Sequence, residues 1–264
     1  NDPLEGSVLS TNQVSMEPID IFGHVYVSGN AAISNPSGNV SLRGNSNVGG
    51  DIMIGVQEPP FPTIDTGLFE PYAVNRLDPT VRTYSSDVYL ENIRIPANTN
   101  PTFTANVIIC GVVYVESPNR VTFAGNTLLI GTIAAAPPVG GLEDNYIRFT
   151  GSSSTLSVST LPDLPKFRGV KSHDGSLLLA PGYFVEYTGN FNTINGSIVA
   201  SKLAFSGDAT GTVKGSIINY EDTDFQIDGS SHLTIDHSHP DDTPGGMTFP
   251  RRLLYVGGTY EEVR

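Results

Sequence analysis

The chain repeats a short run of alternating apolar and polar residues that ends in a glycine followed by a small polar residue. The clearest copies lie between Val185 and Ile235, where Gly189, Gly207 and Gly229 are 18 and 22 residues apart. A period of about 20 residues, made of short strands and glycine turns, is typical of a β-solenoid, in which each coil adds strands to parallel sheets. We therefore predict an all-β protein, a right-handed parallel β-helix, because parallel crossovers are overwhelmingly right-handed.

The same alternation occurs near the N-terminus, in the runs 25–27, 40–42 and 52–54. Successive residues of a strand point to opposite faces of a sheet, so the apolar residues of each run are expected to point into the coil. The residues between them, which are expected to point outward, are Tyr26, Ser41 and Met53.

The solenoid pattern covers residues 21–235, and two proline-rich stretches, 56–101 and 161–182, interrupt it. Proline lacks the N–H that a central strand needs, so both stretches are predicted to be excursions from the coils. Residues 1–20 and 236–264 carry no clear repeat. We expect them to form terminal caps, because the open end of a solenoid exposes unpaired backbone groups.

Four apolar or aromatic residues raise the question of a buried or a functional role. Phe61, Phe69 and Tyr72 of the first excursion are expected to cover apolar surface on the side of the solenoid; alternatively, they line a ligand groove. The single cysteine, Cys110, lies in the apolar run 107–113. Its neighbours predict a buried, unreactive thiol.

Composition and charge restrict the function. The 264 residues include 28 Gly and 19 Pro, which disfavour helices. The net charge is −13, from 14 basic and 27 acidic residues. Such a surface repels phosphate, so we expect no nucleic-acid partner. The scarcity of Lys and the abundance of Asn, Thr, Ser and Gly favour an extracellular location.

No apolar segment reaches the length of about 18 residues that a membrane span needs, so membrane contact would require a segment absent from this chain. The chain begins at Asn1 without a methionine. This start favours a processed secreted protein, or a soluble fragment cut downstream of a signal peptide or membrane anchor.

Two turns carry candidate metal ligands. Asp222 and Asp224 lie in an acidic turn whose oxygens suit calcium, although a charged loop that keeps the protein soluble is the favoured explanation. Asp236, His237 and His239 lie in a His-rich turn, where alternate residues of a strand would share a face and bind a transition metal. Neither turn has the spacing of a closed zinc site, so we assign no metal ligand and no cofactor, with calcium as the cation to test.

The tripeptide Ile235-Asp236-His237 resembles the core of a strand motif in pectate lyases, which are also parallel β-helices. That resemblance implies a calcium-binding aspartate and an arginine base. The candidate arginines are Arg94 in the upstream run 93–96 and the pair Arg251 and Arg252. A polysaccharide-binding or lyase-like protein with a groove on the solenoid is therefore the alternative function, although no catalytic residue is assigned.

Four glycine-rich phrases resemble the β-helical extracellular domain of bacterial PilX-type, pilin-associated surface proteins. They are residues 121–126, 196–208, 215–220 and 250–260. This resemblance implies a structural or adhesive protein of the bacterial surface that is not an enzyme, and a pilus-associated or filament-type assembly. The implied partners are other surface or pilus proteins, or copies of the same chain.

Overall fold

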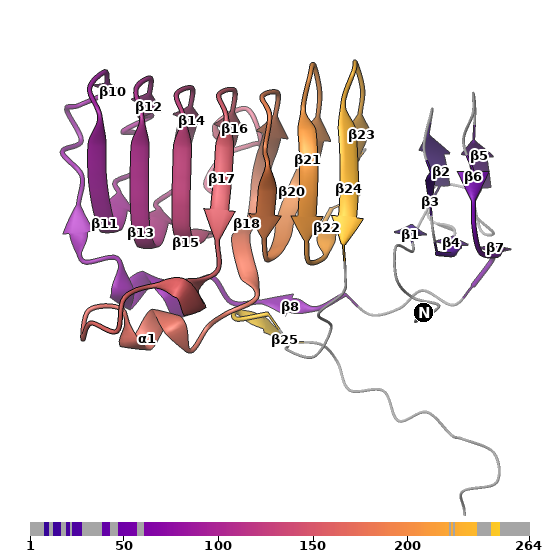
Figure 1. The fold of residues 1–264 in the computed structure, drawn as a ribbon, viewed down its shortest axis with the longest axis horizontal. Helices are drawn as coiled ribbons and strands as arrows, with labels where there is room; N and C mark the ends of the chain where they lie inside the picture. Colours follow the sequence, from indigo (N-terminus) through magenta and orange to yellow (C-terminus); the bar gives the residue numbers. More distant parts are fainter. Residues whose placement is uncertain are drawn as a thin grey trace, which may run out of the picture.

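The protein forms a stack of parallel strands in a computed structural model (Figure 1). The predicted parallel β-solenoid is confirmed, since every strand pairing among the described residues is parallel except that of β8 with β25. The described residues are 8–10, 13–16, 20–21, 23–27, 39–42, 47–56, 61–221, 223, 225–236 and 244–248.

The N-terminal coils begin within the predicted cap. Their strands are β1 (Val8–Ser10), β2 (Gln13–Met16), β3 (Asp20–Ile21), β4 (Val25–Val27), β5 (Asn39–Leu42), β6 (Asn47–Val48) and β7 (Ile52–Ile54). They pair in the orders β1-β4-β7, β2-β5 and β3-β6, so that β1, β2 and β3 form a coil. Val25 and Val27 are fully buried, as predicted. Ile52 and Ile54 are about half exposed because β7 is the last described strand of its stack.

The main solenoid has three sides, which we call A, B and C. Its strands are β9 (Asn75–Arg76), β10 (Thr83–Tyr84), β11 (Val88–Ile95), β12 (Thr102–Phe103), β13 (Val107–Val115), β14 (Asn119–Phe123), β15 (Thr127–Ala135), β16 (Asn145–Phe149), β17 (Ser153–Leu156), β18 (Ser176–Tyr187), β19 (Thr193–Asn195), β20 (Ser197–Phe205), β21 (Thr210–Lys214), β22 (Ile217–Asn219), β23 (Gln226–Ile227) and β24 (His232–Asp236).

Long strands bend and so contribute to two sides. Side A contains the first halves of β11, β13 and β15, followed by β17, β19, β21 and β24. Side B contains β9, the second halves of β11, β13 and β15, the first halves of β18 and β20, and β22. Side C contains β10, β12, β14, β16, the second halves of β18 and β20, and β23.

Glycines form the corner between sides A and B. The corner column contains Asn92, Gly111, Gly131, Gly196 and Gly215, all with positive φ. At Gly131, where φ is 155°, a Cβ would overlap the carbonyl oxygen of Gly111 in the preceding coil. Glycine is required there because two backbones meet where a side chain would stand.

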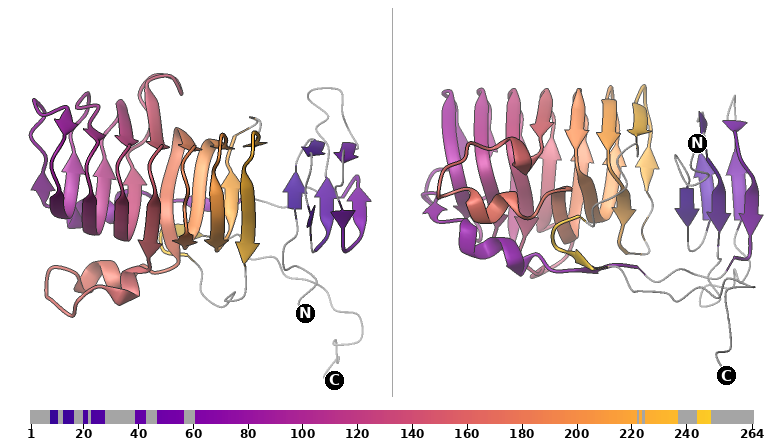
Figure 2. Two further views of the ribbon diagram at one scale, coloured as in Figure 1. Left: turned by 45° about the horizontal axis from the view of Figure 1, so that its top comes forward. Right: turned by 60° about the horizontal axis from the view of Figure 1, so that its bottom comes forward.

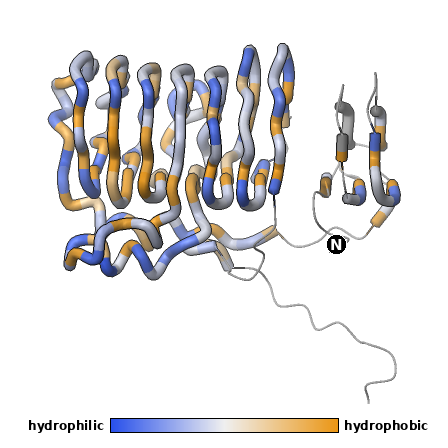
Figure 3. Tube along the Cα trace, viewed as in Figure 1, coloured by the Kyte–Doolittle hydropathy of each residue, from blue (hydrophilic) through white to orange (hydrophobic). Residues whose placement is uncertain are grey.

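Six aromatic rings stack through the interior of side C. They are Tyr84, Phe103, Phe123, Phe149, Tyr187 and Phe205, with neighbouring centroids 4.6–5.3 Å apart and interplanar angles of 6–18°. The spacing follows the distance of about 4.8 Å between neighbouring strands. Figure 3 shows that hydrophobic residues recur in this way along successive coils.

The excursions are shorter than predicted. β10 and β11 lie inside the stretch 56–101 but belong to the coils, and β18 begins at Ser176 inside the stretch 161–182. Pro96 and Pro101 lie between strands, where no ladder hydrogen bond is lost. The elements outside the coils are the strands β8 (Thr63–Ile64) and β25 (Met247–Thr248), the 3-10 helices η2 (Gly67–Tyr72) and η3 (Val158–Thr160), and the helix α1 (Arg168–Lys171).

The excursions cover the outer surface of side B (Figure 2). Phe69, Phe167 and Val170 are fully buried against outward residues of side B such as Val112 and Val199. β25, which lies within the predicted C-terminal cap, pairs with β8 and belongs to this layer. Residues 237–243 and 249–264 of that cap lie outside the described residues.

We predict that Phe123→Ala lowers the free energy of unfolding by about 3–5 kcal/mol, because it removes a buried ring from the middle of the stack and leaves a cavity. Phe61→Ala, at a ring that is 39% exposed, is the matched control and should cost much less. Urea unfolding followed by circular dichroism measures both. Equal losses for the two variants would contradict the importance of the aromatic stack.

We also predict that Gly131→Ala destabilises the protein by about 1–3 kcal/mol or more, because the new methyl group would overlap the neighbouring corner and φ is unfavourable. Gly67→Ala is the control, since a Cβ there would meet only the Asp65 side chain, at 3.2 Å. Thermal unfolding of both variants decides the point, and a Gly131→Ala protein as stable as the parent would show that the corner can move.

Candidate functional site

The predicted metal ligands are placed only in part. Asp236 is the last residue of β24, and its carbonyl oxygen accepts a hydrogen bond from the N–H of Gly215 at 3.2 Å. Asp222, Asp224, His237 and His239 lie outside the described residues. Within the part of the chain that the structure describes, no three His, Cys, Asp or Glu side chains come together as a metal site. Calcium binding therefore stays a prediction.

The arrangement implied by the lyase motif is not formed by Arg94 and Asp236. Arg94 lies in β11, near the start of the main solenoid, whereas Asp236 lies beyond β22 at its other end. Five strand spacings of about 4.8 Å separate β11 from β22, which places these two residues at least about 24 Å apart. Arg251 and Arg252 lie outside the described residues.

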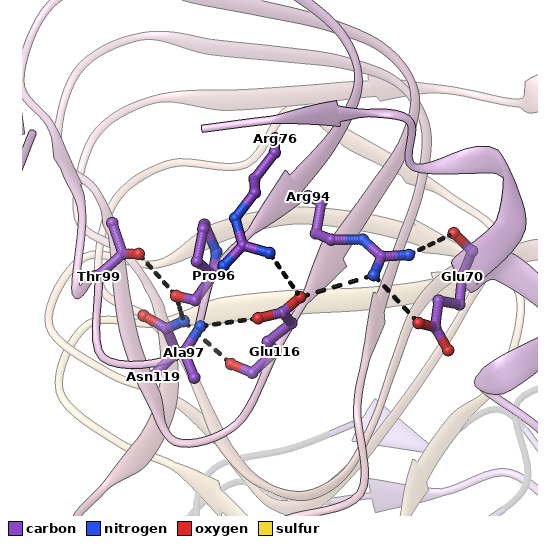
Figure 4. Close-up of polar contacts among 8 residues, drawn as sticks. All are labelled: Glu70, Arg76, Arg94, Pro96, Ala97, Thr99, Glu116 and Asn119. Atoms are coloured by element: carbon purple, nitrogen blue, oxygen red, sulfur yellow. Dashed lines mark hydrogen bonds and ion pairs between the residues drawn. The ribbon is translucent and has the colours of Figure 1, made fainter. Parts of the chain in front are cut away.

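Arg94 instead belongs to a charged cluster at the start of the main solenoid (Figure 4). Its guanidinium lies 3.1 Å from the Glu70 carboxylate and 3.6 Å from that of Glu116, and it donates a hydrogen bond to the Glu70 carbonyl oxygen at 3.1 Å. Arg76 lies 3.8 Å from Glu116. The other Glu116 carboxylate oxygen accepts a hydrogen bond from the N–H of Ala97.

This cluster holds the first excursion against the coils. Glu70 is on η2, Arg94 is on β11 and Glu116 follows β13, so Arg94 connects three elements. The guanidinium also lies over the ring of Tyr114, 5.6 Å from its centroid, and burial raises the pKa of the Tyr114 hydroxyl. The two arginines and two glutamates balance in charge, which suits a structural brace better than a site for a charged ligand.

The aromatic residues of the first excursion divide between two environments. Phe69 is fully buried, and its ring meets that of His173 edge-on at 5.7 Å, while Tyr72 also packs on His173. Phe61 is partly exposed and lies against Tyr220, with the ring centroids 6.2 Å apart. Phe69 and Tyr72 thus cover the solenoid, as predicted.

An exposed apolar surface lies on side A, where the excursions do not cover the coils. We call it the apolar face and define it by Tyr89, Ile108, Leu128 and Leu156. Tyr89, Ile108 and Leu128 are directly opposite one another on β11, β13 and β15. Tyr89 is 59% exposed, Ile108 40% and Leu156 42%. Contiguous exposed apolar surface on a rigid sheet is typical of an interaction site.

No family model, curated protein or solved structure matches the chain.

Polar groups border the apolar face. On one side the Tyr89 hydroxyl donates a hydrogen bond to Glu91 at 2.9 Å, and Lys166 lies 2.6 Å from the same carboxylate. The Lys166 ammonium holds the pKa of Glu91 below its usual range. On the other side Asn126 donates to Asn106, at 2.9 Å, and Asn106 donates to an aspartate, Asp87, at 3.0 Å.

Cys110 lies beside this surface but is not part of it. Its side chain is buried, as predicted, and packs with the excursion residues on side B. The neighbouring Cys110 thiol and Glu91 carboxylate raise the pKa of Tyr89.

Among the described residues no helix is long and apolar enough to cross a membrane.

The apolar face was missed in the sequence, although a signal for it exists. Residues 107–113 are apolar except for Gly111, and the run 127–133 includes three consecutive apolar residues, Leu128, Leu129 and Ile130, so apolar residues are not confined to alternate positions. Such runs are typical of strands that are buried on both faces. The second half of each run is buried in this way on side B, while Ile108 and Leu128 in the first half remain accessible to a partner.

We predict that Arg94→Gln speeds hydrogen exchange in residues 67–73, because η2 loses its ionic and hydrogen-bonded contacts with the coils. Global stability should change by no more than about 1 kcal/mol, since the ion pairs are partly exposed. Arg76→Gln is the control, because its single pair at 3.8 Å is on an arginine that is 60% exposed. Equal exchange in both variants would refute the brace.

Proposed function

We propose that the protein is an extracellular structural or adhesive rod of the bacterial surface, a pilus-associated or filament-type assembly component that acts by binding and not by catalysis. The apolar face carries this proposal, because it presents aligned apolar side chains on the outer surface of a rigid sheet. A stack of coils holds these side chains at fixed spacing, so little conformational entropy is lost when a partner binds.

The composition of the chain supports the same function. Low Lys content, many small polar residues and a net charge of −13 suit a protein exposed to solvent outside the cell. The solenoid supplies an extended side surface, which repeat proteins commonly use for binding. The partner that best fits a flat apolar strip with a polar border is another protein surface, including a second copy of this chain.

We predict that the purified chain self-associates through the apolar face and that Ile108→Glu abolishes the association, because the carboxylate would be desolvated in the interface. Sedimentation velocity over a wide range of protein concentrations measures this. Thr212→Glu, at a partly exposed position on β21 of the same side, is the matched control and should associate like the parent.

A chain that stays monomeric at every concentration would remove self-assembly from the proposal. The polysaccharide alternative is tested in parallel with a glycan array and a calcium-dependent lyase assay. A signal in both that is lost in Asp236→Ala would overturn the structural function.

A further inference from the structure

The main solenoid ends on an open coil formed by β22, β23 and β24. Inward residues of the preceding coils, such as Ile198 and Phe205, are fully buried. Their successors in the same columns are Ile217 and Ile227, which are only partly buried, while Ile235 is 38% exposed. The described pairings join β22 and β23 only to β20, and β24 only to β21. Another layer of strands at this end would bury these inward residues and pair with the edges of β22, β23 and β24.

The N-terminal coils have the same corner sequence as side B of the main solenoid. A glycine, one polar residue and an apolar residue begin each of these strands, at 6–8, 23–25, 50–52, 196–198 and 215–217. A Cβ on Gly50 would lie 2.7 Å from the Gly23 carbonyl oxygen, as a Cβ on Gly131 would overlap that of Gly111. β1, β4 and β7 are thus side B strands of a coil built like the last one.

The direction of the hydrogen bonds matches as well. In the main solenoid the inward Ile198 donates its N–H to the carbonyl oxygen of Ser216 in the next coil, at 2.8 Å. In the N-terminal coils the inward Val8 donates to His24 in the next coil, also at 2.8 Å. Both stacks therefore advance in the same direction with the same hand. Among the described strand pairings, β22 has no partner strand on its forward side and β1 has none on its backward side, so these two edges are complementary.

The chain is long enough for the two edges to meet within one molecule. Phe61 packs on Tyr220, which follows β22 directly, so the chain passes the open end there. Val56 follows β7, and Phe61 is five residues further along the chain, a reach of about 17 Å. Three added coils would raise Val56 by about 14 Å. In Figures 1 and 2 the coil of β1, β2 and β3 lies beside this end, with its strands along those of the last coil.

We propose that the strands β1 to β7 continue the solenoid in the same molecule, with β1, β2 and β3 pairing in parallel with β22, β23 and β24. The corner sequences set the register and place Val8 opposite Ile217 and Leu9 opposite Ile218. The first coils of the chain thus close the end formed by the last coils. This inference goes beyond the proposed function and does not depend on it.

A disulfide tests the closure in the full chain. Leu9→Cys with Ile218→Cys should oxidise to an intramolecular disulfide in the monomer, because residues directly opposite on neighbouring strands meet the required Cα distance. The control is Met53→Cys with Ile218→Cys. Met53 is in the same outward column as Leu9 but two strands further away, so this pair should not cross-link. Cys110 is buried and is present in both proteins.

The outcomes separate the two candidate occupants of this end. Disulfide-linked dimers in place of cross-linked monomers would overturn the proposal in favour of a second copy of the chain. Absence of any cross-link in the Leu9→Cys and Ile218→Cys protein would overturn it as well, as would equal cross-linking of the control.

Hydrogen exchange provides a second measurement that needs no cysteine. The amide of Ile217 faces the next coil, so the closure predicts that it is protected in the parent chain and exchanges markedly faster in Leu9→Pro. The proline removes the Leu9 N–H, which would donate to the Ile217 carbonyl oxygen, and so weakens the pairing of β1 with β22 while leaving the bonds between β1 and β4. A fast Ile217 amide in the parent chain would refute the closure.

Discussion

Stacking of like side chains at the spacing of neighbouring parallel strands is the interaction on which the rest of the structure depends. The six aromatic rings of side C repeat at 4.6–5.3 Å, so each coil must present a ring at the same height as the last. A shift of one residue would turn every inward side chain outward. Burial raises the pKa of Tyr187, the ring whose hydroxyl is enclosed in this column. The fixed register in turn aligns the outward residues, including those of the apolar face.

The solenoid could be predicted from sequence because its corners tolerate only a few residue types. Gly131 has a backbone oxygen where its Cβ would stand, so a glycine is required at this corner and the spacing of the glycines indicates the length of each coil. Proline was a weaker guide. Pro96 and Pro101 lie between β11 and β12, where proline removes no ladder hydrogen bond, although in the sequence alone they indicate a break in the strands. The first excursion was therefore predicted to be too long.

The candidate site could be predicted less well, because it depends on how distant segments align. Glu70, Arg94 and Glu116 meet only because an excursion folds back on the coils. The apolar face depends on what the excursions leave uncovered: Val112 is buried beneath them, whereas Ile108, four residues earlier in the same strand, is exposed. Both residues belong to one apolar run. Gly111 marks the corner between their two sides, but nothing in the run shows which side the excursions cover. The metal-ligand candidates rested on local composition alone, and Asp236 lies far from Arg94 in the stack.

The ends of the stack determine how such a rod can grow. Inward residues direct their N–H groups to the next coil, so every solenoid of this hand has a forward edge and a backward edge that differ in polarity. Pairing of β1 with β22 joins one forward edge to one backward edge. After that pairing, the inward residues left without a covering coil are those of β7, where Ile52 and Ile54 are 48% and 51% exposed. That end again accepts only a backward edge. Copies that joined through it would therefore join head to tail, in a heterologous contact that extends without closing, while the apolar face would remain available along the side for a different partner.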